Sequence, residues 1–131
     1  MTELVEAREY FRQDRFATEN GAEIRAVGPG WAECSLKLTP RHRNALGNVM
    51  GGAIFMLGDF AFAVASNFGG RPTVSTTSQI TFLRAAKGDA LLARAELIRE
   101  GRSSVYCEVS VWDEPGNLVA RLTAAGAVVG E

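Results

Sequence analysis

This 131-residue sequence has very little histidine and almost no net charge. His42 is the only histidine, which excludes a metal site built from several histidines. Fourteen basic residues stand against fifteen acidic ones, a formal net charge of −1, and the basic residues are scattered along the chain. The sequence therefore offers no basic stripe of the kind that binds nucleic acid, and we expect no nucleic-acid partner.

Export signals are also lacking. The first residues, MTELVEAREYFRQDRF, are charged throughout and have no apolar core of the signal-peptide kind. We therefore expect a cytoplasmic protein in which Cys34 and Cys107 stay reduced. Both cysteines fall on apolar positions of expected strands, where they are predicted to be small core residues. The length fits one domain over residues 1–131, with residues 1–20 as a helical flank.

One stretch, residues 44–70, has almost no charge. Asp59 is its only ionisable residue, although 22% of the chain is charged. The stretch predicts a helix that begins near Met50 and ends before Gly69, and it is almost long enough to span a membrane. A central aspartate costs about 2.5–3.5 kcal/mol on membrane insertion, so we expect a helix inside a protein core and no membrane partner.

Asp59 has only apolar neighbours on that helix. The residues three and four positions away are Phe55, Met56, Phe62 and Ala63. We therefore expect the carboxylate to be buried, which is costly unless it is paired or hydrogen-bonded. Two interpretations stay open: Asp59 is a working acid or base, or it is a structural residue bonded to backbone groups.

Most of the remaining chain alternates apolar and polar residues, as strands do. Residues 3–15 predict one short amphipathic helix, with Asp14 on its apolar stripe. In residues 73–82, we expect Val74, Ile80 and Phe82 on the same face of a strand. The expected strands are residues 22–27, 31–39, 73–82, 90–100, 105–112 and 118–129. Short turns, among them the hairpin signal of residues 113–117, favour antiparallel neighbours among the last four strands.

This order of elements predicts an α+β fold. A single helix that is apolar nearly all round must be covered on most sides, and one curved antiparallel sheet wrapped around it would do so. Such a sheet is too small to close into a barrel. Its free edge and the open side of the helix would need a partner, so we expect at least a homodimer.

The start of the long helix offers a second chemical feature, the pair Gly51 and Gly52. The first N–H groups of a helix lack acceptors and carry partial positive charge, so an acyl oxygen could bind there. Alternatively, the glycines allow tight packing against the sheet. Asp59 follows Gly51 by eight residues, about 12 Å of helix rise, so a substrate or water would lie between them. His42, between two arginines, is expected in a solvated or phosphate-facing loop.

The segment HRNALGNVMGGAIFMLGDFAFAVASN resembles the signature of hotdog-fold acyl-CoA thioesterases of the PaaI-like branch. In that family an Asn, a Gly, a His-Gly-Gly and a later Asp recur at this spacing. Residues 76–124 resemble the rest of that domain, and the match covers roughly residues 21–129. The resemblance implies one long helix wrapped by an antiparallel sheet, an acyl-CoA substrate, and a dimer or a dimer of dimers.

The resemblance also implies catalytic roles. Asp59 would be the catalytic carboxylate, which attacks the thioester or activates water. Gly51 would give the oxyanion N–H, and Asn44 would help to hold the thioester or the water. Thr77 would reach from the partner subunit to position the water.

For substrate binding, we expect Met50 and Gly52 near the thioester, and Arg84 and Arg102 at the rim for the CoA phosphates. No metal or cofactor is expected, because coenzyme A is part of the substrate. Met50 stands where the family commonly has histidine, and it cannot donate a strong hydrogen bond. A non-catalytic acyl-CoA binding or regulatory module is therefore the alternative. A hotdog-fold hydratase is disfavoured, because those enzymes usually use a histidine in a different motif.

Overall fold

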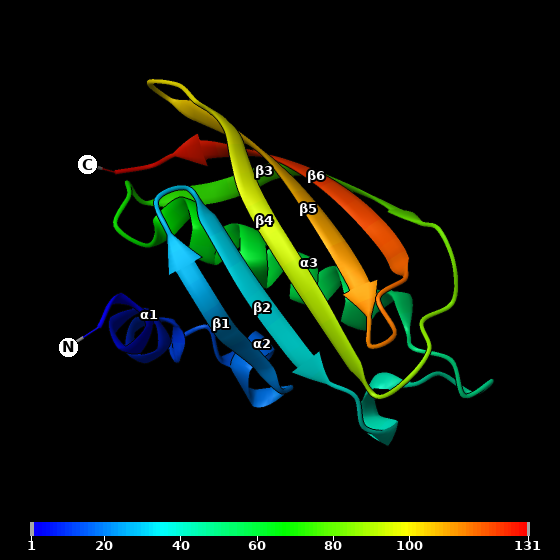
Figure 1. Ribbon diagram of the computed structural model, residues 1–131. Helices are drawn as coiled ribbons and strands as arrows, with labels where there is room; N and C mark the ends of the chain where they lie inside the picture. Colours follow the sequence, from blue (N-terminus) through cyan, green and yellow to red (C-terminus); the bar gives the residue numbers. More distant parts are fainter. Residues whose placement is uncertain (1, 131) are drawn as a thin grey trace.

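A six-stranded antiparallel sheet curved around one long helix makes up most of the described chain (Figure 1). The computed structural model describes residues 2–130. Its helices are α1 (Glu3–Phe11), α2 (Arg15–Glu19) and α3 (Gly51–Asn67), with a short 3-10 turn at Pro40–His42. Its strands are β1 (Ala22–Gly28), β2 (Trp31–Lys37), β3 (Thr73–Phe82), β4 (Ala90–Glu100), β5 (Ser104–Asp113) and β6 (Leu118–Val128).

The strand order is β1-β2-β4-β5-β6-β3, and every neighbouring pair is antiparallel. The α+β prediction of one long helix in a curved antiparallel sheet is confirmed. The expectation that the last four strands are neighbours in chain order is wrong for β3 and β4. After α3 the chain enters the sheet at its far edge, as β3 beside β6, and residues 83–89 then carry it back to β4 beside β2.

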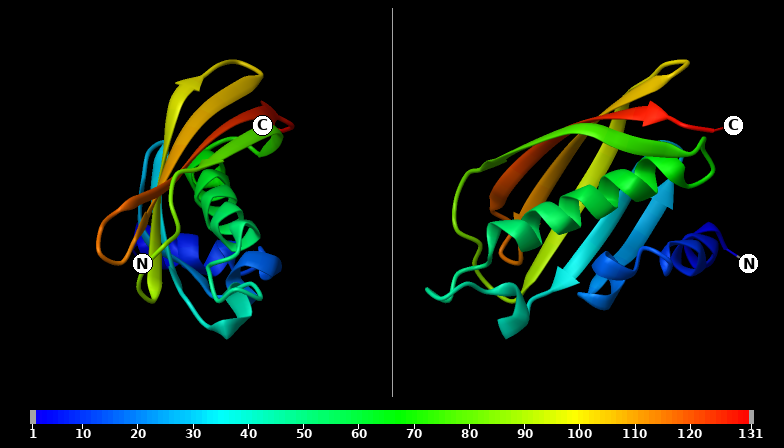
Figure 2. Two further views of the ribbon diagram at one scale, coloured as in Figure 1. Left: turned by 90° about the vertical axis from the view of Figure 1, so that its right-hand side faces the viewer. Right: turned by 180° about the vertical axis from the view of Figure 1, so that it is seen from behind.

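The core lies between α3 and the concave face of the sheet, as Figure 2 shows. The inward face of α3 presents Leu57, Ala61 and Val64, which are completely buried. Cys34 and Cys107 are also fully buried, as small core residues of β2 and β5. The alternating strand patterns predicted these buried positions correctly. In the described chain, no helix is both long and apolar enough to cross a membrane.

The N-terminal flank is two helices, whereas the sequence predicted a single one. Phe11 packs edge-on against Phe60 of α3, with the ring centroids 6.3 Å apart, and fixes the end of α1. The chain then turns through residues 12–14, where the Asp14 N–H donates to the Phe11 carbonyl at 3.0 Å. After this turn α2 contacts α3, and Ala17 is buried.

The prediction that Val74 lies on the same face of β3 as Ile80 and Phe82 is also wrong. The register of β3 against β6 shifts between Ser75 and Thr77, which marks a β-bulge. An extra residue in one strand reverses the alternation, so the side chains before the bulge point to the face opposite to the one that an unbroken strand would give them. Thr73 is therefore 8% exposed and buried, whereas Val74 is 51% exposed on the outer side of this edge strand.

Candidate active site

Asp59 lies halfway along α3, on the face turned away from the sheet. It is half-buried, so it is more accessible than the sequence predicted. Within residues 2–130 its carboxylate has no hydrogen-bond or ion-pair partner, which removes the interpretation of a structural residue bonded to backbone groups. It opens into a cavity of about 290 Å³ between α2 and α3. The other lining residues are Asp14, Arg15, Phe16, Ala17, Met56, Phe60 and Ala63.

The surroundings of Asp59 favour its protonated form. Burial among apolar side chains raises the pKa of Asp59 above its ordinary value, and the negative charge of Asp14 raises it further. A carboxylate with a raised pKa is a stronger base when it is ionised. An unpaired group of this kind in a cavity is typical of a catalytic carboxylate.

The start of α3 keeps free backbone donors. Met50 is its N-cap and contributes no side-chain hydrogen bond. In the described chain, the N–H groups of Gly51 and Gly52 have no acceptor. A Cβ on Gly51 would lie 3.0 Å from the Phe82 ring, whereas one on Gly52 would meet nothing within 4 Å. Gly51 therefore serves close packing against β3 and also offers a free donor, and Gly52 borders open space.

A second hollow, of about 260 Å³, adjoins the Asp59 cavity. It contains Met50 and Gly52 and shares Phe16 and Met56 with that cavity. Met50, Gly52 and Asp59 therefore lie along the outer face of α3, with Met50 at its N-cap. Phe16, on α2, is 76% exposed and borders both hollows. Sequence reasoning did not single out this residue.

Gly51 and Arg84 come together in a different hollow. This space of about 380 Å³ lies between the start of α3 and residues 82–86. Arg84 is held there by a 3.3 Å hydrogen bond from its Nη1 to Asn117 Oδ1. Within one chain, the Gly51 and Asp59 hollows have no lining residue in common.

Asn44 organises the loop before α3. Its Oδ1 accepts hydrogen bonds from the N–H groups of Leu46 at 3.0 Å and Asn48 at 3.1 Å. The side-chain oxygen is therefore used within the loop, and the side-chain NH₂ is what remains for a ligand. Asn44 is exposed and borders neither the Asp59 cavity nor the Gly51 hollow.

Thr77 and Arg102 lie away from Asp59 in the same chain. Thr77 is exposed on the edge strand β3, just after the bulge. Arg102 is in the turn between β4 and β5, where its carbonyl accepts a 2.6 Å hydrogen bond from Arg71. Arg84 precedes the eleven residues of β4 and Arg102 follows them, a strand about 36 Å long. One chain therefore does not bring these two arginines together.

His42 is buried, so the prediction of a solvated or phosphate-facing residue is wrong. The Thr39 N–H donates to His42 Nδ1 at 3.0 Å, which leaves the proton on Nε2 to donate to the Asn20 carbonyl at 2.6 Å. The His42 carbonyl also accepts from the Met50 N–H at 2.8 Å. This one residue therefore joins the end of α2 to the start of α3.

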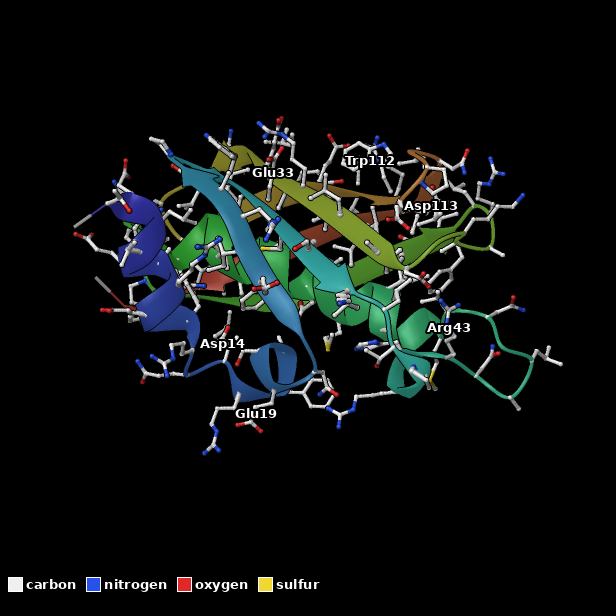
Figure 3. The ribbon with its side chains drawn as sticks, turned by 60° about the horizontal axis from the view of Figure 1, so that its bottom comes forward. Asp14, Glu19, Glu33, Arg43, Trp112 and Asp113 are labelled. Carbon is white, nitrogen blue, oxygen red and sulfur yellow. The ribbon has the colours of Figure 1, made fainter. Side chains whose placement is uncertain are left out.

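Asp14 is a second carboxylate in the lining of the Asp59 cavity, and sequence reasoning did not predict its place there. It lies at the bend between α1 and α2, as Figure 3 shows. The available signal was its polar side chain on the apolar stripe of the helix predicted over residues 3–15. A stripe of that kind normally faces the core, so a carboxylate on it is out of place.

A curved antiparallel sheet around one long helix is the architecture of the hotdog fold. The Thioesterase superfamily model matches residues 46–120. Acyl-coenzyme A thioesterase PaaI of Escherichia coli K12 is 29% identical over 115 residues, which cover 87% of this chain and 82% of that protein. Human acyl-coenzyme A thioesterase 13 is 28% identical over 100 residues, covering 73% and 71%.

Solved structures agree. The E. coli PaaI structure superimposes with a TM-score of 0.89 at 27% identity and covers 95% of this chain and 91% of that one. A hypothetical thioesterase of Streptococcus pneumoniae, crystallised with coenzyme A, gives 0.85 at 25% identity, covering 92% and 98%. The chain therefore belongs to the thioesterase superfamily, as a thioester hydrolase of its hotdog-fold, PaaI-like branch.

Proposed function

We propose that the protein hydrolyses acyl-CoA thioesters with Asp59 as the catalytic carboxylate. The observation that carries this proposal is the half-buried Asp59 side chain, which faces a cavity without any hydrogen-bond partner in the described chain. Relatives named acyl-coenzyme A thioesterase, and a related structure with coenzyme A, support CoA as the carrier of the acyl group.

In the proposed reaction, ionised Asp59 attacks the thioester carbonyl or removes a proton from an attacking water. The Gly51 N–H stabilises the negative charge that develops on the carbonyl oxygen. The carbon–sulfur bond then breaks and CoA leaves as its thiolate, which takes up a proton. On the water route this step releases the free acid directly, whereas direct attack leaves a mixed anhydride on Asp59, which water hydrolyses to the free acid and free Asp59. Thr77 positions the water, and the Asn44 NH₂ holds the thioester. Because Asp59 acts as base or nucleophile and the Gly51 N–H stabilises the oxyanion, the proposed reaction uses no metal or cofactor.

The proposed site is shared between two protomers. Gly51 and Asp59 are eight residues apart on α3, about 12 Å of rise, and line separate hollows. A single thioester carbonyl cannot contact both groups of one chain. The free edge of β3 exposes Val74, Thr77 and Phe82, which suits pairing with a second copy. We infer a homodimer, or a dimer of such dimers, with Arg84 and Arg102 as candidates for the CoA phosphates.

The test is release of CoA thiol from a panel of aryl, short-chain and long-chain acyl-CoAs. We expect the wild type to hydrolyse at least one substrate and Asp59→Asn to be slower by about 1,000-fold or more, because the amide has the same volume but is neither a base nor a nucleophile. Glu9→Gln, a similar change at an exposed position of α1, is the control and should keep the wild-type rate.

The same substrate panel distinguishes the enzyme from the alternative, a module that binds acyl-CoA without cleaving it. Met50 is 53% exposed in the hollow beside Asp59, where the family commonly has a hydrogen-bonding histidine. This observation favours a module that binds acyl-CoA without cleaving it. If wild type and Asp59→Asn are equally inert while calorimetry shows tight acyl-CoA binding, the binding module replaces the enzyme.

Sharing of the site is tested by complementation. Asp59→Asn and Thr77→Ala are each expected to be impaired, and co-expression produces mixed dimers. A mixed dimer has one site with both native residues, so activity should rise well above that of either variant alone. Activity no higher than the average of the two variants would place both residues in a site within one chain.

A further inference from the structure

The N-terminal flank provides one wall of the Asp59 cavity. Four consecutive residues, Asp14 to Ala17, line it from α2, and Met56, Phe60 and Ala63 line it from α3. Asp14 and Asp59 are the two carboxylates of this space, and they come from segments about 45 residues apart in the sequence.

Asp14 is not used to cap the helix that it precedes. It is the N-cap residue of α2, a position where an aspartate usually accepts a hydrogen bond from the first turn, yet its side chain makes no such bond. Its backbone carbonyl instead accepts from the Thr18 N–H at 3.1 Å. The carboxylate is therefore left to the cavity.

The position of Asp14 is fixed at both ends of α2. On one side, the Asp14 N–H donates to the Phe11 carbonyl and Phe11 packs on Phe60. On the other, the His42 Nε2–H donates to the Asn20 carbonyl at 2.6 Å. These contacts hold the short helix, and with it the carboxylate, beside the outer face of α3.

Other charges do little to offset the two carboxylates. Among residues 2–130, Arg15 is the only cation in the cavity lining, and its Nε donates to Glu19 Oε2 at 2.7 Å on the exposed side of α2. Asp59 is the only titratable residue on α3. The adjoining hollows contribute the remaining charged and titratable groups, namely Arg41 and His42 on one side and Arg8, Arg12 and Glu23 on the other.

We propose that Asp14 is a positioning residue for the thioesterase reaction, whose negative charge sets the pH at which Asp59 becomes a working base. The proposal rests on the proposed role of Asp59. Two like charges in one low-polarity cavity do not ionise together easily, so one proton is retained to a higher pH. Burial raises the pKa of Asp14 as well. The N-terminal flank therefore contributes to catalysis through Asp14, in addition to covering α3.

The first test is the pH profile of kcat/KM. Asp14→Asn removes the charge and keeps the volume, so the acid limb should move to lower pH by about half a unit, which makes the variant about threefold faster than wild type below that limb. Asp14→Glu should keep the wild-type limb, and so should Glu9→Gln, which removes a charge from the same flank outside the cavity. A profile of Asp14→Asn that superimposes on wild type overturns the proposal.

The second test does not depend on activity. Carbon-13 NMR titration follows the side-chain carboxyl of Asp59, assigned by its absence in Asp59→Asn. We expect its midpoint to fall in Asp14→Asn and to stay in Glu9→Gln. A lower midpoint without any acyl-CoA hydrolysis would overturn the proposed function and leave the carboxylate pairing standing. An unchanged midpoint in an enzyme that Asp59→Asn inactivates would overturn only the role of Asp14.

Discussion

Asp59 and Asp113 carry the same side chain in two regions that treat it differently. Asp113, labelled in Figure 3, ends β5 and is only 4% exposed. Its Oδ1 accepts from the Asn117 N–H at 2.7 Å, and its Oδ2 accepts from Asn117 Nδ2 and the Lys87 N–H, both at 3.0 Å. Asp59, on the outer face of α3, has no such donor in the described chain.

The two carboxyl groups respond with opposite pKa shifts. Burial acts to raise the pKa of Asp113, but the hydrogen bonds from Asn117 and Lys87, with the charge of Arg84, outweigh it and lower the pKa. At Asp59 no group among residues 2–130 opposes burial and the charge of Asp14, so its pKa rises. A buried carboxylate that is satisfied stabilises the fold, whereas one left unsatisfied costs stability and remains available for chemistry.

The largest effect that sharpens this comparison is expected for Asp113→Asn. The amide would turn N–H groups toward the donors of Asn117 and Lys87, so we expect the Tm at neutral pH to fall by several degrees. Thermal unfolding followed by circular dichroism measures it. The kcat of the folded protein should stay within about twofold of wild type, since no residue of the hairpin lines the Asp59 cavity or the Gly51 hollow. Any loss of activity should appear in KM, because Asn117 of this hairpin holds Arg84, the candidate for the CoA phosphates. An unchanged Tm would mean that these hydrogen bonds contribute little.

An intermediate effect is expected where a polar group is added on the outer face of α3. Met50→His supplies a donor in the hollow beside Asp59, and one hydrogen bond of about 0.5–1.5 kcal/mol corresponds to a gain of up to about tenfold in kcat/KM. The measurement uses the acyl-CoA panel, with Leu46→His, on the exposed loop before α3, as the control. A loss of activity on every substrate would show that Met50 serves the site as an apolar residue.

The smallest effect is the stability change of Asp59→Asn. Because the folded-state pKa of Asp59 is raised, ionisation costs the folded state free energy at neutral pH, and an amide avoids that cost. We expect Tm to rise by about 1–2 °C at pH 7, and the gain to vanish as the pH falls below the ordinary aspartate value of 3.8. The ionised carboxylate of Asp113 has the opposite effect and stabilises the folded state, because its folded-state pKa is lowered. This stabilisation is present above pH 3.8 and is lost as the pH falls. A lower Tm for Asp59→Asn at pH 7 would contradict the comparison.

Local pattern was enough to predict much of this molecule. The alternation in β2 and β5 placed Cys34 and Cys107 in the core, and the uncharged stretch around Asp59 predicted the long helix and its single carboxylate. These features depend on which face of an element is apolar, and a sequence records that directly.

Features that depend on contacts between distant segments were missed. The bulge that turns Val74 outward follows from how β3 meets β6, and the burial of His42 follows from its bond to Asn20. The place of Asp14 in the lining of the Asp59 cavity requires the bend between α1 and α2. Periodicity within one segment contains none of this information.

The strand order also has a consequence for how the chain folds. β2 pairs with β4 in a register that joins Ala32 to Ala95, so about 60 residues, including all of α3 and β3, must be looped out before the centre of the sheet can close. Closing a loop of that size is entropically costly and makes the contact order high, which places folding toward the millisecond-to-second range. The β4–β5–β6 meander forms from near neighbours and is suited to assemble first. Until β2 docks, the part of the apolar surface of α3 that packs on β2 stays exposed, and that interval is when a nascent chain is most prone to aggregate.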